Sequence, residues 1–245
     1  MIPQLRRQRI LELVRDKEVT LLEDLVQAMG LSESTIRRDL NLMKASGELE
    51  LLRGGGIRMA GANHEKDVLT KLHLQKAEKE RIAAMAAGFI EPGDVLFLDP
   101  SSANSMLINY LAGMKVSVVT NSLMHINQLL KANIRCFMIG GQIKTQTLSC
   151  VGVGALSAMK EYRFSKCFLG ANGMDPRMGI TNHDPNELHI KRLAIEYSVK
   201  AYFLIDSSKF GTVNMCRVAG IDECTIITDR RLPELAGYSN ILYAE

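Results

Sequence analysis

The stretch from Ser32 to Met43 combines side chains that can bind nucleic acid with side chains that can pack in a core. On a helix, successive residues are turned by about 100°, so Ile36, Leu40 and Met43 would share one face. The opposite face would carry hydroxyl, guanidinium and amide groups, from Ser34, Arg37, Arg38 and Asn41. Such groups bind phosphate oxygens and base edges in the major groove of DNA. The stretch therefore predicts a DNA-reading helix, and a surface helix with two solvated arginines is the alternative.

The segments before this stretch predict the elements that would position it. Apolar spacing predicts a helix over residues 4–17, and Thr20 followed by Glu23 has the spacing of a capping box that opens a second helix. Gly30 would end that second helix. Ser32 can then cap the third helix, which we expect to end at about Ser46.

Two short strands are expected after the third helix. Residues 48–52 partly alternate acidic and apolar side chains, residues 53–56 read Arg-Gly-Gly-Gly, and residues 57–59 return as a second strand. Three helices and a hairpin in this order are typical of a winged helix-turn-helix, in which the third helix enters the major groove. We therefore predict a DNA-binding domain over residues 3–58, with the helix-turn-helix at about 20–39. Its predicted contacts to double-stranded operator DNA are Ser32, Ser34, Thr35, Arg37, Arg38, Asn41, Arg53 and Arg58.

The remainder of the chain has a different pattern. A polar, weakly periodic segment at residues 59–75 predicts a linker, and a larger domain at 76–245 follows it. Buried strands are expected at 95–98, 116–119, 136–139, 167–169, 201–205, 225–227 and 241–243. Helical stretches lie between these apolar runs, and such alternation predicts an α/β fold with a mainly parallel sheet.

Polar and small residues follow five of the predicted strands. In open α/β sheets, ligands bind beyond the carboxyl ends of the strands, where hydroxyl groups and backbone amides can hold an anion. Ordinary loop and cap residues are the alternative for any single loop. Five such loops at one edge predict a site for a small polar ligand, most simply a phosphorylated one. The predicted site residues in these loops are Asp99, Ser101, Ser102, Asn104, Thr120, Asn121, Ser122, Gly140, Gly141, Asn172, Gly173, Asp206 and Lys209.

Composition limits the class of protein. The chain has 245 residues, 47% of them hydrophobic, and a net charge of +3. No apolar run approaches the roughly 18 residues that a membrane span needs, and the N-terminus does not resemble a signal peptide. Five cysteines without metal-type spacing are expected to be reduced and buried, in a cytoplasmic protein.

The N-terminal motifs resemble those of the DeoR family of bacterial transcriptional regulators. The matching segments are Arg9–Leu11, Thr20–Glu23, Gly30–Ser32, Thr35–Leu40 and Arg53–Gly55. The resemblance implies a regulator, most often a repressor of a sugar-use operon, whose effector is a phosphorylated sugar.

The larger domain resembles the sensor domain of the same family, which is similar in fold to ribose-5-phosphate isomerase. The matching segments are Lys79–Ala83, Val118–Ser122, Gly140–Gly141, Gly170–Gly173, Gly179–Thr181, Glu187, Lys191–Arg192 and Asp206–Gly211. The resemblance adds Glu187 and Lys191 to the predicted effector site. The chain departs from the family at its first sugar-phosphate loop, where Ser101 stands in place of the usual glycine and follows Pro100.

Two other functions fit parts of the sequence. A sugar-phosphate isomerase-like enzyme fused to a DNA-binding domain could use Asp99, Asp175, Glu187 and Lys209 for proton transfer. A structural DNA-binding protein without an effector is the other alternative. His183, Asp184, Glu187 and His189 lack a recognised metal spacing, so we expect no metal and no cofactor. Since one recognition helix covers only a few base pairs, we expect a homodimer or homotetramer.

Overall fold

The computed structural model describes residues 2–15, 17, 19–46, 48–52, 54–59 and 67–245. The chain divides into two compact units, Met1–Asp67 and Val68–Glu245, and each is described by itself. The predicted DNA contact Arg53 lies outside the described residues, as do residues 60–66 of the segment predicted as a linker.

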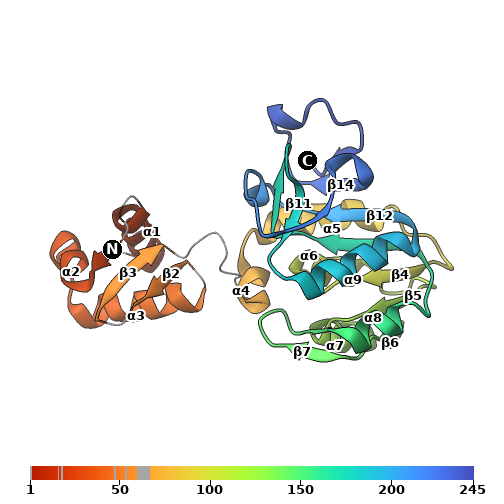
Figure 1. Cartoon of the computed structure of the whole chain (residues 1–245), viewed down its shortest axis with the longest axis horizontal. Coiled ribbons are helices and arrows are strands. Elements are labelled where there is room, and N and C mark those ends of the chain that lie inside the picture. Colours follow the sequence, from red (N-terminus) through yellow and green to blue (C-terminus); the bar gives the residue numbers. More distant parts are fainter. Residues whose placement is uncertain (1, 16, 18, 47, 53, 60–66) are drawn as a thin grey trace. The chain divides into compact units, whose positions relative to one another are not determined.

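The first unit contains three helices and a small antiparallel sheet (Figure 1). The helices are α1 (Pro3–Arg15), α2 (Leu22–Met29) and α3 (Glu33–Ala45). The strands are β1 (Thr20–Leu21), β2 (Leu49–Leu51) and β3 (Gly56–Met59), arranged in the order β1-β3-β2. A winged helix-turn-helix has this order of elements, so the predicted fold of this segment is confirmed.

The predicted capping box at Thr20 is wrong. Thr20 lies in β1 and pairs with Ile57 of β3, and its side chain is buried. Leu21 therefore occupies the N-cap position of α2, without a side-chain hydrogen bond to the helix. The strand pairing to a residue far along the chain outweighs the local capping pattern.

The apolar stripe predicted for the third helix faces the core of the first unit. Ile36, Leu40 and Met43 pack with Ile10 of α1 and Leu25 of α2, and all five side chains are almost fully buried. Gly30 ends α2 in the left-handed conformation, with φ of 61°, which is why the tight turn into α3 requires a glycine there.

The second unit is built on a seven-stranded sheet in the order β15-β14-β12-β9-β4-β5-β6. Every neighbouring pair in this sheet is parallel. Its strands are β4 (Val95–Leu98), β5 (Ser117–Thr120), β6 (Arg135–Met138), β9 (Phe164–Gly170), β12 (Ser198–Leu204), β14 (Thr225–Thr228) and β15 (Ile241–Tyr243). All seven predicted strands are thus confirmed, within a few residues at each end.

Helices cover both faces of this sheet. They are α4 (Val68–His73), α5 (Lys76–Ala87), α6 (Ser102–Leu107), α7 (Leu123–Lys131), α8 (Val153–Met159) and α9 (Pro185–Glu196). One apolar cluster contains Ile82 of α5, Leu107 of α6 and Leu129 of α7 against the sheet. A second cluster contains Met159 of α8 and Ile190 of α9 on the other side. The unit therefore has three layers, as predicted for an α/β fold.

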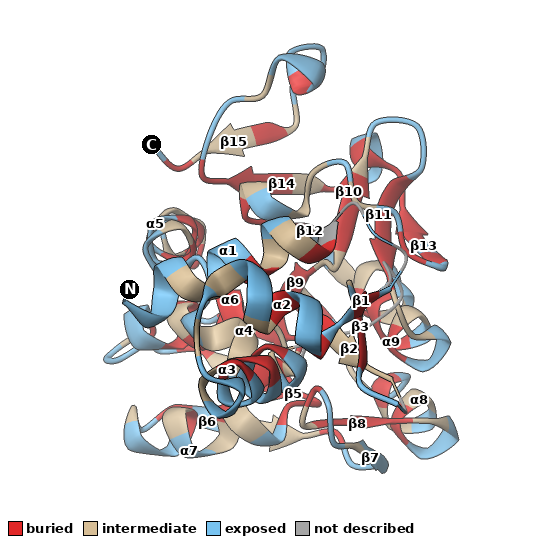
Figure 2. Cartoon of the chain, turned by 90° about the vertical axis from the view of Figure 1, so that its left-hand side faces the viewer, coloured by how far each residue is buried: buried red, intermediate tan, exposed pale blue. Residues whose placement is uncertain are grey.

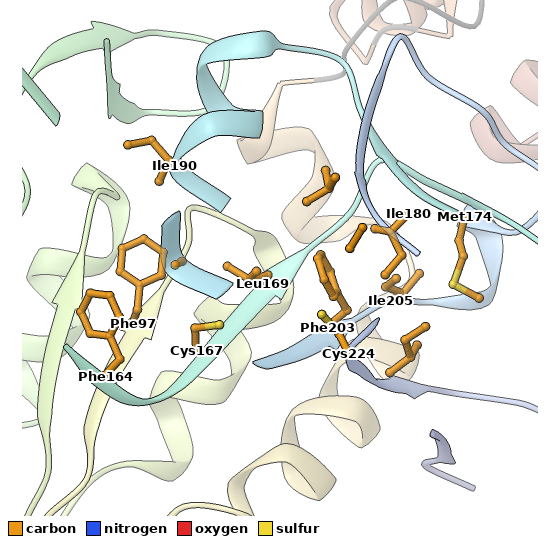
Figure 3. Packing of buried hydrophobic residues seen from close by; sticks show 14 of the residues in the cluster. Phe97, Phe164, Cys167, Leu169, Met174, Ile180, Ile190, Phe203, Ile205 and Cys224 are labelled. Atoms are coloured by element: carbon orange, nitrogen blue, oxygen red, sulfur yellow. The ribbon is translucent and has the colours of Figure 1, made fainter. Parts of the chain in front are cut away.

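The second cluster continues from the main sheet into a small antiparallel sheet. Figure 3 shows Phe97, Phe164 and Cys167 at one end of this cluster and Met174 beside Ile180 at the other. The small sheet has the order β10-β11-β13, with strands Gly173–Asp175, Gly179–Asn182 and Cys216–Ala219. In Figure 2, β11 and β14 are red along most of their length because most of their residues are buried.

Three features of the second unit differ from the prediction or were not predicted. Helix α4 lies inside the segment expected to be a linker, and it belongs to the second unit. The small sheet was not predicted, and neither was a hairpin of β7 (Gln142–Lys144) and β8 (Ser149–Val151). These strands have only three or four residues each, too few for a clear alternation of apolar and polar side chains. No helix in the described part of the chain combines the length and the apolar character that a bilayer span requires.

Candidate functional site

The exposed face of α3 carries the side chains predicted to contact DNA. Ser34, Arg37, Arg38 and Asn41 are exposed, opposite the buried stripe. Thr35 is half-buried, and its hydroxyl lies 2.9 Å from the hydroxyl of Ser32. Ser32 occupies the predicted N-cap position, but its side chain makes no capping hydrogen bond; its backbone carbonyl accepts from Thr35 and Ile36. The hydroxyl groups are therefore free of the helix backbone.

Two of the predicted DNA contacts form ion pairs at the surface. Arg37 donates to Glu33, one turn earlier on α3, at 2.6 Å. Arg58 on β3 pairs with Glu50 on β2, its cross-strand partner, at 2.6 Å. Exposed ion pairs of this kind contribute at most about 1 kcal/mol to the stability of the folded protein. A DNA phosphate can therefore replace Glu33 or Glu50 as the partner of the arginine at a small cost in free energy.

A buried ion pair holds the recognition helix. Asp39 points to the interior from α3, and its carboxylate binds the guanidinium of Arg6 from α1 through two hydrogen bonds. The side chain of Asp39 is 3% exposed and that of Arg6 is 15% exposed. Hydrogen bonding to Asp39 raises the pKa of Arg6 above its ordinary value. Sequence reasoning missed this role because the partners are 33 residues apart.

The turn between β2 and β3 depends on two glycines. Gly54 and Gly55 have φ of 89° and 83°, a region that side chains rarely adopt. The carbonyl of Gly55 accepts from the backbone of Leu22, the first residue of α2. Concave surfaces between this turn, α2 and α3 are lined in part by Arg37 and Asn41. The turn and the recognition helix thus form one continuous face of the first unit.

In the second unit, the first predicted effector loop surrounds a buried carboxylate. Asp99 is 1% exposed and directly follows the last residue of β4. One carboxylate oxygen accepts from Asn104 at 2.8 Å and from the backbone of Ser101 at 3.1 Å. The other accepts from the backbone of Gly170 at 2.9 Å and from Lys191 of α9. Both oxygens are therefore occupied, which leaves Asp99 poorly suited to act as a catalytic base.

Ser101 is accommodated without backbone strain and packs closely against Gly170. Its φ is −77°, and its hydroxyl accepts from the backbone of Asn104, so no positive φ is needed at this position. A side chain on Gly170 would lie 2.4 Å from the β-carbon of Ser101. Gly170 therefore has to be a glycine, because any side chain there would collide with Ser101. Ser102, the next residue, is also buried.

The second loop is buried beside the β7–β8 hairpin. Thr120 donates to the carbonyl of Leu98 and accepts from the backbone of Ser122. Asn121 exchanges hydrogen bonds with Cys150 of β8, and all three loop side chains are at most 1% exposed.

Glu187 is the centre of a second polar cluster. One of its carboxylate oxygens accepts from Lys144 at 3.0 Å and from Thr147 at 2.7 Å. The other accepts from Asn182 of β11 at 2.8 Å. Glu187 lies one helical turn before Lys191 on α9, so the two polar clusters share this helix.

The other predicted effector residues differ in their surroundings. Gly140 and Gly141 follow the edge strand β6 and are exposed. The backbone of Asn172 donates to the carbonyl of Thr181, and Gly173 is buried. The carboxylate of Asp206 accepts from Ser208, and Lys209 is half-buried. A surface ion pair between Lys209 and Asp206 is the alternative to a ligand contact for Lys209, and no such pair forms among the described residues.

Four polar residues near these loops were not predicted. Lys144, Thr147 and Asn182 hold Glu187, and His125 of α7 lies 3.1 Å from the hydroxyl of Ser105. Burial lowers the pKa of His125 to about 4, although the charge of Asp99 opposes this shift. No local sequence pattern marks these residues, and only the fold brings them close to the predicted loops.

The carboxylates and histidines of the described residues do not form a metal site. No group of three or more metal-ligating side chains lies together in the described part of the chain. Asp184 is instead the N-cap of α9 and pairs with Lys144 at 3.1 Å. Burial raises the pKa of Asp184, but hydrogen bonds from the backbone of Asn186 and from Lys144 outweigh burial and place it below its ordinary value.

Comparison with known proteins relates both units to one family. Residues 6–60 match the model of the DeoR-like helix-turn-helix domain, and residues 74–230 match that of the DeoR C terminal sensor domain. The uncharacterized HTH-type transcriptional regulator FruR of Bacillus subtilis is 37% identical over 229 residues, which cover 93% of this chain and 91% of FruR. The lactose phosphotransferase system repressor of Staphylococcus epidermidis is 29% identical over 84% of this chain and 83% of its own. The solved ribose 5-phosphate isomerase A of Methanocaldococcus jannaschii, at 16% identity, aligns with 56% of this chain and 55% of its own, with a TM-score of 0.42.

These relatives also decide between a regulator and an enzyme. FruR and the lactose phosphotransferase system repressor are named as regulators, and the helix-turn-helix model matches the first unit. The alternative of an isomerase-like enzyme is therefore not supported. A winged helix-turn-helix followed by a three-layer α/β unit, with these matches over nearly the whole length, shows that the chain belongs to the DeoR family of helix-turn-helix transcriptional regulators.

Proposed function

We propose that this chain is a cytoplasmic repressor of carbohydrate-use genes, and that a small sugar phosphate bound to the second unit controls its binding to operator DNA. The exposed polar face of α3 carries the DNA-binding half of this proposal. The name of the staphylococcal relative, a lactose phosphotransferase system repressor, supports the link to carbohydrate. The proposed DNA contacts are the predicted residues of α3 together with Arg53 and Arg58.

The effector half of the proposal rests on the loops at the carboxyl edge of the parallel sheet. Asp99, Asn104 and Lys191 form one polar cluster there, and Glu187 is the centre of a second. Carboxylate and amide groups suit sugar hydroxyls. Since carboxylates already bind Lys144 and Lys191, we assign the ligand anion to Lys209.

A thermal-shift screen of the full chain with pentose and hexose monophosphates tests the effector half. A ligand that binds only the folded protein stabilises it by about 2.7 kcal/mol at a hundredfold excess over its dissociation constant. Lys209→Ala should lose this stabilisation yet bind operator normally. Lys200→Ala, an exposed lysine at the other end of β12, is the matched control and should respond as wild type does.

Two results would contradict the proposal. If no sugar phosphate raises the melting temperature of the wild type, the class of effector is wrong. If Lys209→Ala responds at the same concentrations as wild type, the anion binds elsewhere.

A further inference from the structure

The β7–β8 hairpin contacts three elements of the second unit at once. Thr147 in its turn donates to Glu187 of α9 at 2.7 Å. The carbonyl of Leu148 accepts from the backbone of Leu123, the first residue of α7, at 2.9 Å. The carbonyl of Gln146 accepts from the backbone of Val68, the first residue of α4, at 2.8 Å. Helix α9 carries the predicted effector residue Glu187, and α7 directly follows the predicted effector residue Ser122. Helix α4 is the first element of the second unit.

The contact with Glu187 is the polar anchor of the hairpin turn. Thr147 is 5% exposed, and its hydroxyl also lies 2.8 Å from that of Ser149. A hydroxyl has a single hydrogen, which Thr147 gives to the carboxylate, so Ser149 must donate to Thr147. Lys144 adds a charged hydrogen bond to the same oxygen of Glu187. Hydrogen bonds to a buried carboxylate are stronger than neutral ones, and the turn is held firmly to α9.

The backbone of the turn is itself held in an uncommon conformation. Leu148 has φ of 47°, which a leucine adopts only when its surroundings require it. Two hydrogen bonds hold the backbone here: the amide of Leu123 donates to the carbonyl of Leu148, and the neighbouring Thr147 donates to Glu187. A turn under such constraint can relax when one contact is lost.

Helix α4 is held at its other end by a buried lysine. Lys79 of α5 is 4% exposed and donates to the carbonyls of Lys71 and Leu74, at and just beyond the end of α4. Burial lowers the pKa of Lys79 to about 8, with Asp206 opposing and Lys209 adding to the shift. Lys79 thus holds the end of α4 and also responds to the charges of Asp206 and Lys209, two predicted effector residues.

We propose that the β7–β8 hairpin is a latch that fastens α4 to the effector site through Glu187, so that a ligand competing for Glu187 releases α4. The proposal rests on the proposed function, since it takes Glu187 as a ligand contact. A sugar hydroxyl that binds Glu187 would compete with Thr147 for the same oxygen. Release of the turn would then free the Val68 amide, at the point where the second unit begins.

Hydrogen exchange of the full chain without ligand tests the latch directly. Thr147→Val removes the hydroxyl with little change in shape, and the amides of Val68–His73 should then exchange about tenfold faster or more. Thr145→Val is the matched control, because Thr145 is an exposed residue of the same turn. Thr147→Ser keeps the hydroxyl and should restore slow exchange.

Exchange in β9 keeps the test specific, since it reports whether the whole unit has been destabilised. Faster exchange of α4 with unchanged exchange of β9 supports the latch. Faster exchange confined to residues 142–151, with α4 as in wild type, would overturn it. Should Thr147→Val fail to fold, Lys144→Met weakens the same anchor and carries the same expectation.

Operator binding then tests whether the hairpin couples ligand binding to DNA affinity. With a sugar phosphate that stabilises the wild type, the ratio of operator affinities with and without ligand should fall toward one in Thr147→Val, because the latch is already open. A wild-type ratio in this variant would refute the coupling. If no sugar phosphate stabilises the wild type, the proposed effector class fails while the exchange experiment still decides on the latch.

Discussion

At the scale of single residues, α3 has one face of buried side chains that hold the helix in place and an opposite face of exposed side chains that can contact DNA. Ile36 and Asp39 point inward, one into the apolar core and one to Arg6. Arg37 and Arg38 point outward, and Arg37 rests on a carboxylate that a DNA phosphate can replace. The two arginines can therefore be removed without disturbing the fold.

Removing either arginine should weaken operator binding. If the arginine contacts only phosphate, the Ala variant should reduce the salt slope of binding by about one. If it reads a guanine, the variant should lose about 1–3 kcal/mol and relax specificity at that base pair. Titrations of operator across a salt series distinguish the two cases. Wild-type affinity and slope in both variants would mean that α3 does not read the operator.

The buried His125 predicts a pH dependence of stability. Its pKa in the folded protein is about 4, against an ordinary value of 6.5. Between these values the unfolded chain binds a proton that the folded chain excludes, so stability is lost as the pH falls from about 6.5 toward 4. His125 should lower the free energy of unfolding by about 1.4 kcal/mol for each pH unit of acidification in this window.

Denaturant unfolding at several pH values measures this effect. His125→Asn should lessen the dependence on pH relative to wild type, and His189→Asn, at an exposed position on α9, should not. Parallel curves for wild type and His125→Asn between pH 4 and 7 would contradict the prediction.

At the scale of elements, the Arg6–Asp39 pair joins α1 to the recognition helix. Removing one partner of a buried ion pair leaves the other charge without compensation, which is more costly than the loss of an exposed pair. The exposed Arg37–Glu33 pair, within the same helix, provides the comparison.

Asp39→Asn should therefore lower the melting temperature of the first unit by several degrees. Just below the wild-type melting temperature, it should also reduce the helical circular dichroism signal. Glu33→Gln should leave both nearly unchanged, because the side chain of Glu33 is 57% exposed. If the two variants melt at the same temperature, Arg6 does not stabilise α3.

At the scale of the whole molecule, we expect an operator to be recognised by two copies of α3. A single recognition helix reaches only a few base pairs, and two half-sites about one turn of DNA apart are read by a symmetric dimer. We expect sedimentation at micromolar concentration to give a dimer or a tetramer, and the operator to bind at least two chains. A monomer that binds DNA one to one would contradict this expectation.

The sequence by itself was enough to determine the three helices of the first unit, the seven strands of the parallel sheet and the core face of α3. Helical spacing placed Ile36, Leu40 and Met43 in the core, and the apolar runs located every strand of the parallel sheet. These features depend on patterns that repeat within one segment, at 3.6 residues for a helix or in a continuous run for a buried strand. The loops after the strands were also located, because parallel strands end at one edge of a sheet.

Only the tertiary structure decided which polar groups meet. Asp99 and Lys191 are 92 residues apart, Thr147 and Glu187 are 40 apart, and Arg6 and Asp39 are 33 apart. No local pattern marks these partners, because each pair forms only when distant elements pack. The same reason explains the error at Thr20, where pairing with Ile57 outweighed a local capping pattern. Local periodicity thus determined the strands of the parallel sheet and the helices of the first unit, whereas long-range packing determined the short strands and the contacts of the sites.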